Sequence, residues 1–162
     1  MLQPMFALML RWIRPWILPF GCLALLGVAP LGAQEIRPYR VEGLAIEQPL
    51  AASGDAARGR ALLVARDPAN CILCHAAPAD LVKSGVRFSG NLAPSLDGAG
   101  ARWTAGQLRL RIVDSRRLNP DTIMPSYYLS EGLVEVAAAW RGKPIMNAQQ
   151  IEDLIAYLRT LQ

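Results

Sequence analysis

The clearest hydrophobic pattern lies at the end of the chain. Apolar residues there recur at the three- and four-residue spacing of one helix face, and they are Ile151, Leu154, Ile155, Leu158 and Leu161. Asn147 precedes this stripe as an N-cap, and Gln150 follows three residues later, where a capping box needs it. The pattern therefore predicts a helix after Asn147, with Met146 and Ile151 packed together across its first turn.

A second helix is expected to open at residues 53–55, where Ser53 or Asp55 supplies the N-cap. This helix is predicted to run to about Arg66. Three small or apolar residues share one of its faces, namely Ala56, Gly59 and Leu63. A glycine inside a helix costs about 1 kcal/mol relative to alanine. Gly59 therefore predicts that another helix crosses this face closely.

Thr104 predicts the start of a third helix, in which Leu108 and Ile112 lie one turn apart and which ends near Asp114. Four arginines make this region basic, and they are Arg109, Arg111, Arg116 and Arg117. We interpret this run as a solvated face, with a partner-docking surface as the alternative. No internal repeat or low-complexity segment interrupts the predicted helices.

Residues 1–33 have the three parts of a secretory signal peptide. Residues 1–15 carry two arginines and no acidic residue, residues 16–31 are almost wholly apolar, and two small residues follow. The alternative is an uncleaved membrane anchor. However, two prolines bracket an apolar core well short of the ~20 residues that a spanning helix needs. Cleavage after Ala33 is therefore predicted.

Cleavage would leave an arm over residues 34–52, which has no clear period and contains two prolines, and a domain over residues 53–162. The whole chain has 17 basic and 13 acidic residues, and loss of the two arginines in the signal peptide leaves 15 basic residues. Such a near balance gives no reason to expect a nucleic-acid partner. No membrane partner is expected after cleavage either.

The three cysteines differ in their expected fates. Cys22 lies in the signal peptide and is lost with it, and the other two would form a disulfide by default in an oxidising compartment. However, Cys71-Ile72-Leu73-Cys74-His75 is the C-x-x-C-H pattern of covalent haem attachment. In this pattern the thiols add to the porphyrin vinyl groups and the histidine binds the iron. Cys71 and Cys74 are therefore predicted to hold one haem c, with His75 as an axial ligand.

Other uses of these cysteines fit less well. A thioredoxin-like redox pair needs a βαβ context, and none is visible in the sequence. A zinc site needs four ligands, whereas the chain after cleavage offers two cysteines and one histidine. A structural module with a disulfide and no haem remains as a third hypothesis, and it requires the C-x-x-C-H pattern to be accidental.

The second axial position has few candidates. His75 is the only histidine, which excludes an intramolecular bis-histidine haem and leaves a methionine, a lysine or no ligand. The signal peptide aside, the methionines are Met124 and Met146, and the packing role of Met146 explains it fully. Met124 lies in a loop over residues 119–128 that two prolines keep from forming regular helix. Met124 is therefore the predicted ligand, and a loop methionine that fills a core gap is the alternative.

The loop over residues 91–98 is expected to support His75. A backbone carbonyl near Pro94 is predicted to accept the Nδ1 proton of His75 and so fix the ring, which is a role that metal-bound histidines require. Packing at the haem edge is expected from four residues, which are Ile72, Leu73, Met124 and Tyr127. With His75 and Met124 both bound, the iron would have no open site, and a thioether ligand would raise the reduction potential.

The order of these features resembles the class I cytochrome c fold. That fold has an N-terminal helix, the C-x-x-C-H motif, a Pro-Ser-Leu-x-Gly loop, a Met-Pro loop and a C-terminal amphipathic helix. The resemblance implies an all-α domain with a single haem over residues 53–162, preceded by an extended N-terminal arm. The terminal helices of this fold cross beside the haem.

Nearly the whole chain after residue 33 is similar to the SoxX family, the monohaem subunit of the bacterial sulfur-oxidation cytochrome SoxAX. The matching stretches are Pro49-Leu50, Gly54-Asp55, Gly59-Arg60, Asn70–His75, Ala93–Gly98, Leu108–Asp114, Thr122–Tyr128, Trp140–Pro144 and Glu152–Leu158. The most specific of them is Asn-Pro-x-Thr-x-Met-Pro-x-Tyr-Tyr. Ala69 and Ala93 depart from the pattern, because glycine is expected at both positions.

The SoxX resemblance implies partners and a reaction. SoxX pairs with a SoxA-type cytochrome, dihaem or monohaem, and the periplasmic pair oxidatively joins thiosulfate to a cysteine of the carrier SoxYZ. This heterodimer is an L-cysteine S-thiosulfotransferase whose chemistry is expected on the SoxA haem. The present chain would then be an electron-transfer subunit with no catalytic residue of its own, and it would pass electrons to a small soluble cytochrome c. The alternative is a free-standing periplasmic electron-shuttle cytochrome c, which an obligate partner would distinguish.

Overall fold

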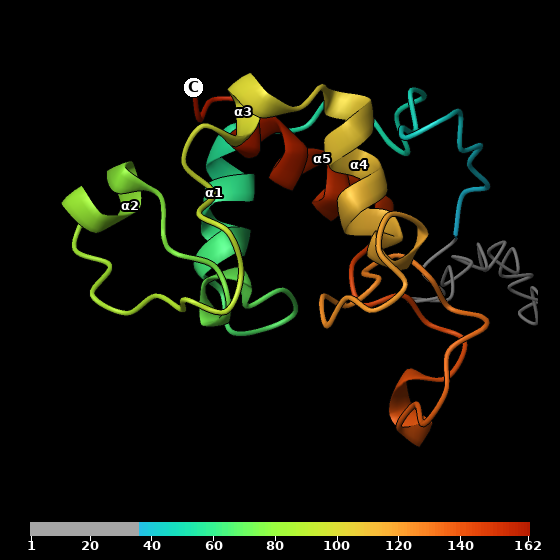
Figure 1. Cartoon of the computed structure of the whole chain (residues 1–162). Helices are drawn as coiled ribbons and strands as arrows, with labels where there is room; N and C mark the ends of the chain where they lie inside the picture. The colour runs from blue at the N-terminus through green and yellow to red at the C-terminus, as the bar shows by residue number, and fades with distance from the viewer. Residues whose placement is uncertain (1–35) are drawn as a thin grey trace, which may run out of the picture. The chain divides into compact units, whose positions relative to one another are not determined.

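The protein is described by a computed structural model that covers residues 36–162. This part of the chain contains five α-helices and no β-strand: α1 (Ala56–Val64), α2 (Ala79–Lys83), α3 (Ala99–Arg102), α4 (Ala105–Val113) and α5 (Ala148–Leu158) (Figure 1). Single turns of 3₁₀ helix occur at Cys71–Leu73, Ser115–Arg117 and Ala138–Trp140. The all-α prediction is confirmed, whereas the predicted signal peptide lies outside the described residues. None of the helices in residues 36–162 is long and apolar enough to cross a membrane.

All three predicted helices form, and each has its predicted cap. Asp55 caps α1 by accepting a hydrogen bond from the backbone of Arg58, at 2.8 Å. Thr104 and Asn147 each complete a capping box, with Gln107 and Gln150 as the reciprocal partners. Satisfied end groups explain why these three segments begin where the sequence predicts.

The end of α1 differs from the prediction, whereas the start of α5 agrees with it. α1 ends at Val64 rather than near Arg66, because the backbone of Ala65 is extended and turns the chain out of the helix. Met146 and Ile151 at the start of α5 are both fully buried, as the packing prediction requires. The core thus begins directly at the first turn of α5.

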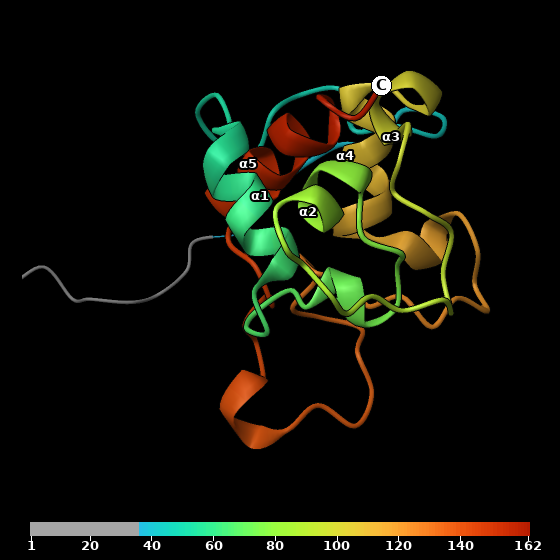
Figure 2. The same cartoon turned by 90° about the vertical axis from the view of Figure 1, so that its left-hand side faces the viewer.

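α1 and α5 cross at two glycines (Figures 1 and 2). A Cβ atom added at Gly59 would overlap the backbone carbonyl of Asp153, and one added at Gly54 would overlap that of Glu152. Neither backbone carbonyl can move without shifting its helix. The prediction that Gly59 permits a close helix crossing is therefore confirmed.

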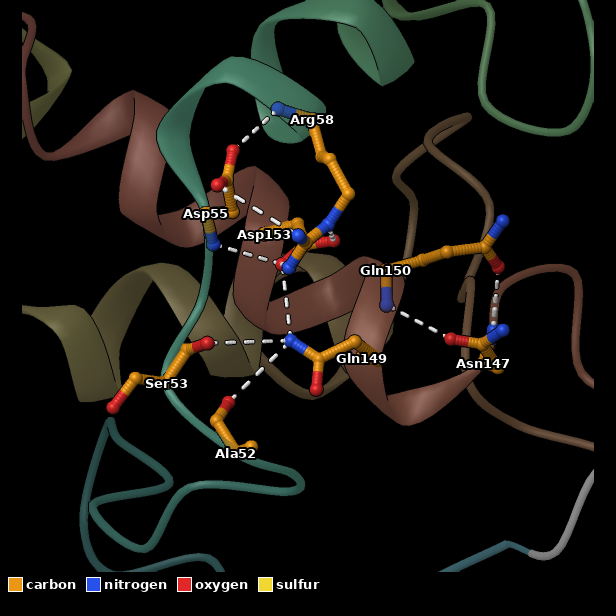
Figure 3. Close-up of polar contacts among 8 residues, drawn as sticks. All are labelled: Ala52, Ser53, Asp55, Arg58, Asn147, Gln149, Gln150 and Asp153. Carbon is orange, nitrogen blue, oxygen red and sulfur yellow. Dashed lines mark hydrogen bonds and ion pairs between the residues drawn. The ribbon is translucent and has the colours of Figure 1, made fainter.

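A cluster of hydrogen-bonded polar side chains links the start of α1 to α5 (Figure 3). Asp153 of α5 accepts hydrogen bonds from the guanidinium of Arg58, at 2.7 and 2.8 Å, and from the backbone of Asp55, at 2.8 Å. Gln149 adds a third donor, at 3.0 Å. The side chain of Asp153 is only 4% exposed. These donors, with Arg58 the largest cause, lower the pKa of Asp153 to about 2.

The low pKa of Asp153 predicts a specific loss of stability in acid. An unfolded aspartate titrates near pH ~3.9, so the stabilisation by ionised Asp153 is complete above about pH 4 and is lost as the pH falls toward 2. Urea unfolding of the wild type and of Asp153→Asn is expected to show a free-energy difference that shrinks over this interval. The exposed Glu131 provides a matched control, because Glu131→Gln has no such cluster to disrupt. A difference between wild type and Asp153→Asn that stays constant from pH 6 to pH 2 would contradict the assignment.

The N-terminal arm packs on the helices over part of its length. Ala45, Ile46 and Leu50 are buried, and Ile46 donates a backbone hydrogen bond to the carbonyl of Gly106 in α4, at 3.0 Å. Leu50 donates to the carboxylate of Glu152 in α5, at 2.8 Å. The arm therefore belongs to the same hydrophobic core as the helical domain.

Arg109 departs from the interpretation of the arginine run as a solvated face. Its side chain is buried and forms a bidentate ion pair with Glu152, in which Nε lies 2.7 Å from Oε1 and Nη2 lies 2.8 Å from Oε2. Arg109 also donates to the backbone carbonyl of Ile46 in the arm. The sequence interpretation was wrong at Arg109 because the arm supplies a carbonyl, and α5 a carboxylate, that no local pattern reveals.

The segment between Tyr128 and Ile145 extends away from the helices in both views (Figures 1 and 2). It is a loop with one 3₁₀ turn at Ala138–Trp140, and its Val134 side chain is 82% exposed. Gly142 has a positive φ of 69°, a left-handed conformation that glycine adopts without steric cost. Apart from Pro144, which is buried, the residues of this segment do not belong to the hydrophobic core.

Candidate functional site

The predicted site residues meet at one cavity of about 250 Å³. Cys71, Cys74 and His75 line it together with the segment over residues 92–96 and the Met124 loop. Helices contribute apolar side chains to the lining, namely Leu63, Ile112, Leu154 and Leu158. A largely apolar cavity with a few converging polar groups is the usual form of a cofactor site.

The cysteine segment is held in a single helical turn. The carbonyl of Cys71 accepts backbone hydrogen bonds from Cys74, at 3.2 Å, and from His75, at 3.0 Å. This turn begins after Asn70, whose φ of 47° lies in the left-handed region. Both thiols are free, and burial raises the pKa of the Cys71 thiol to about 12. The turn thus presents the side chains of both cysteines and the imidazole to the same cavity.

His75 is tied to the segment that runs beside it. The Nδ1 atom of His75 lies 2.7 Å from the carbonyl oxygen of Pro94. A carbonyl oxygen only accepts hydrogen bonds, so this contact places a proton on Nδ1. In the neutral imidazole the Nε2 atom is then unprotonated and has the lone pair that a metal ion binds.

The segment over residues 90–93 is fixed by backbone hydrogen bonds to the cysteine turn. Gly90 donates to the carbonyl of Ile72, at 2.8 Å, and Leu92 and Ala93 both donate to the carbonyl of Cys74, at 3.0 Å. A Cβ atom at Gly90 would overlap the carbonyl of Leu73, so the two segments approach as closely as their backbones allow. Sequence reasoning missed this role of Gly90, since its partner lies on a different loop.

Met124 is positioned through its backbone. Its carbonyl accepts a hydrogen bond from the hydroxyl of Ser115, at 2.7 Å, and its N–H donates to the hydroxyl of Thr122, at 3.2 Å. Met124 lines the cavity, whereas Met146 is fully buried and does not. The structure therefore brings Met124, and not Met146, to the cavity that His75 also lines.

The residues expected at the haem edge divide into two pairs. Met124 and Tyr127 line the cavity, and the Tyr127 hydroxyl donates to the carbonyl of Ala69, at 3.0 Å. Burial raises the pKa of Tyr127. By contrast, Ile72 packs in the core and Leu73 is 52% exposed, and neither contributes to the lining. The helical turn explains this difference, because it points the two intervening side chains away from the side that carries the thiols.

The donor set fits a covalently attached haem better than a bare metal ion. Two free thiols, one imidazole and one thioether surround an apolar cavity, and these are the groups that a c-type haem uses. Within residues 36–162, no group of three or more histidine, cysteine, aspartate or glutamate side chains is placed to hold a metal ion.

Known proteins resemble this chain in both sequence and structure. Residues 56–162 match the family model described as cytochrome c. A curated protein of Synechocystis, named cytochrome c-553-like, is 30% identical over 139 residues, which are 86% of this chain and 94% of the relative. A chain in the crystal structure of SoxXA from P. pantotrophus is 37% identical with a TM-score of 0.68, and the match covers 76% of this chain and 93% of that one. The chain is thus similar to proteins of one family over most of its length.

Proposed function

This chain belongs to the cytochrome c family, resembles SoxX in sequence and structure, and binds haem c covalently. We propose that it is the electron-accepting subunit of a SoxAX-type complex. In this proposal the partner is a SoxA-type cytochrome with one or two haems. The complex oxidatively couples thiosulfate to a cysteine of a SoxYZ-type carrier in the periplasm. This chain then passes the electrons to a small soluble cytochrome c.

The observation that supports an electron-transfer role is the meeting of Cys71, Cys74, His75 and Met124 at one apolar cavity, and the likeness to a chain of SoxXA favours the subunit. In this proposal Cys71 and Cys74 would hold the haem through thioether links, and His75 and Met124 would bind its iron. The bound haem supplies a one-electron redox couple. With both ligands bound, the iron would have no free coordination site for a substrate, so the site would suit electron transfer and would need no catalytic residue of this chain.

The remaining residues of the site orient these ligands. The Pro94 carbonyl holds the proton on Nδ1 of His75, which leaves the other ring nitrogen available. Ser115 and Thr122 hold the backbone of Met124 from both sides of its peptide. The apolar side chains of α1, α4 and α5 limit the access of water, which favours the less charged reduced state of the centre.

The second candidate function is a free-standing periplasmic electron carrier. The Synechocystis relative is named as a cytochrome c, and its name mentions no second subunit. The match covers 94% of the length of that relative. Both candidates use the same haem residues, so only the presence of a stable partner separates them. An obligate subunit buries a large interface, whereas a shuttle binds weakly and in a salt-sensitive way.

The test is an affinity purification of the tagged protein from its own periplasm, followed by haem staining. The proposal predicts a second haem-staining chain in stoichiometric amount and reduction of the haem by thiosulfate once the carrier is added. The haem-free variant Cys71→Ser/Cys74→Ser is the control for reduction by other means. A single haem-staining chain that thiosulfate does not reduce would contradict the subunit role and support the free carrier.

A further inference from the structure

The loop that supports His75 has a complete set of hydrogen bonds on four consecutive carbonyls. The carbonyl of Pro94 lies 2.7 Å from His75 Nδ1, and that of Leu96 accepts from the backbone of Ala99, at 3.1 Å. The carbonyls of Ser95 and Asp97 both accept from one side chain, the guanidinium of Arg102. This loop is therefore held by individual hydrogen bonds rather than by regular secondary structure, and one arginine side chain supplies the donors to two of its four carbonyls.

Arg102 comes from the last position of α3, the short helix that directly follows the loop. Its guanidinium reaches back over one helical turn, with the Nη2 atom 2.9 Å from the carbonyl oxygen of Ser95. The same group lies 4.8 Å from the ring centre of Trp103. The planar fork of an arginine can serve two carbonyls and an aromatic ring at once, which an ammonium group cannot.

A second contact anchors the far side of the loop. The carboxylate of Asp97 accepts a hydrogen bond from the backbone of Ala79 at the start of α2, at 2.9 Å. The loop is thus fixed to α2 on one side and to Arg102 on the other. Between the carbonyls of Pro94 and Ser95 only the two backbone dihedrals of Ser95 can change, because peptide units are planar. Fixing the Ser95 carbonyl therefore restricts the direction of the Pro94 carbonyl.

We propose that Arg102 is a positioning residue for His75, because it fixes the loop whose Pro94 carbonyl orients the imidazole ring. This proposal rests on the proposed role of His75 as an axial ligand. A carbonyl held in place keeps the Nδ1 proton shared with it and so makes the other nitrogen a more basic ligand. A more basic ligand stabilises the oxidised iron, so loosening the loop raises the reduction potential.

Arg111 provides a matched control for Arg102. Its guanidinium also lies over the Trp103 ring, at 4.4 Å, but its hydrogen bond goes to the carbonyl of Gln107 within its own helix. Arg102→Gln and Arg111→Gln therefore each remove one positive charge and one cation–π contact. Only Arg102→Gln releases the carbonyls of Ser95 and Asp97.

The experiment measures two properties of the haem-loaded variants. Nuclear magnetic resonance follows the exchange of the His75 Nδ1 proton with solvent, and a redox titration gives the midpoint potential. For Arg102→Gln we expect exchange about tenfold faster than in the wild type, as for the loss of hydrogen bonds worth about 1–2 kcal/mol. We also expect a potential above that of Arg111→Gln, which should keep the wild-type exchange rate.

A second variant keeps the charge constant. Arg102→Lys retains a cation but lacks the fork, so the proposal predicts the faster exchange in this variant as well. If Arg102→Gln does not fold, the proton exchange rate and midpoint potential of Arg102→Lys test the positioning role instead. Equal exchange rates and potentials in the Arg102 and Arg111 variants would overturn the positioning role and leave the proposed function intact. A wild-type protein whose His75 resonances show no bound iron would instead contradict the proposed ligation itself.

Discussion

Replacement of Met124 by alanine is expected to change the absorption spectrum of the haem-loaded protein and to lower its reduction potential. We propose Met124 as the sixth iron ligand, and a thioether ligand stabilises the reduced iron. The other methionine in residues 36–162, Met146, is fully buried and does not line the cavity, so it is not positioned to replace Met124. The expected result is a lower midpoint potential and loss of the spectral features of a methionine-bound haem, measured by redox titration and optical spectroscopy.

Met146 offers the control for this prediction. It is fully buried beside Ile151 and does not line the cavity, so Met146→Leu conserves volume and is expected to cost less than about 1.5 kcal/mol. The spectrum and potential of Met146→Leu should stay close to those of the wild type. An unchanged spectrum in Met124→Ala would show that another group, or none, binds the iron at this position.

Replacement of Arg109 by methionine is expected to destabilise the protein by about 3–5 kcal/mol. The change leaves the buried carboxylate of Glu152 with the backbone of Leu50 as a remaining partner, and it frees the carbonyl of Ile46. An uncompensated buried charge is among the costliest single changes in a folded protein. Urea unfolding of the haem-loaded variant measures the loss, and limited proteolysis reports whether the arm over residues 36–52 has been released.

The double variant Arg109→Met/Glu152→Leu separates the unpaired charge from the lost packing. Removing both charges is expected to recover a substantial part of the stability, because the desolvation cost of the lone carboxylate disappears. Arg117→Met, which changes an exposed arginine of the same run, should have little effect. A loss below about 1 kcal/mol in Arg109→Met would show that the ion pair does not hold the arm to α4 and α5.

Local features of the sequence were predictable because their physical causes are local. A helix cap depends on residues within three positions of one another, so Thr104 and Asn147 could be identified from the sequence, and the cap of α1 could be narrowed to Ser53 or Asp55. Gly59 was identified by the penalty that a glycine carries inside a helix. The C-x-x-C-H pattern likewise contains within five residues the three groups that we assign to haem attachment and to the first axial position.

Contacts between segments that are distant in the sequence could not be predicted from local patterns. Arg109 looked like one member of a basic run, and only the fold shows that Glu152 and the arm enclose it. Gly90 carried no periodic signal, although its backbone lies against that of the cysteine turn. Arg102 is separated from His75 by 27 positions and acts on it, in our proposal, through a loop between them. Each of these roles depends on a partner that the chain brings close only after folding.

The most direct test of covalent haem attachment is the intact mass of the protein purified from its own organism, combined with a mass map of its peptides. If Cys71 and Cys74 hold the haem, the chain is heavier by one haem, and the added mass lies on the peptide that contains both cysteines. A chain without this addition, in which each of the two thiols has lost its hydrogen atom to a disulfide, would contradict the assignment of a covalent haem site. That result would favour the structural module that the cysteine spacing left as the third hypothesis.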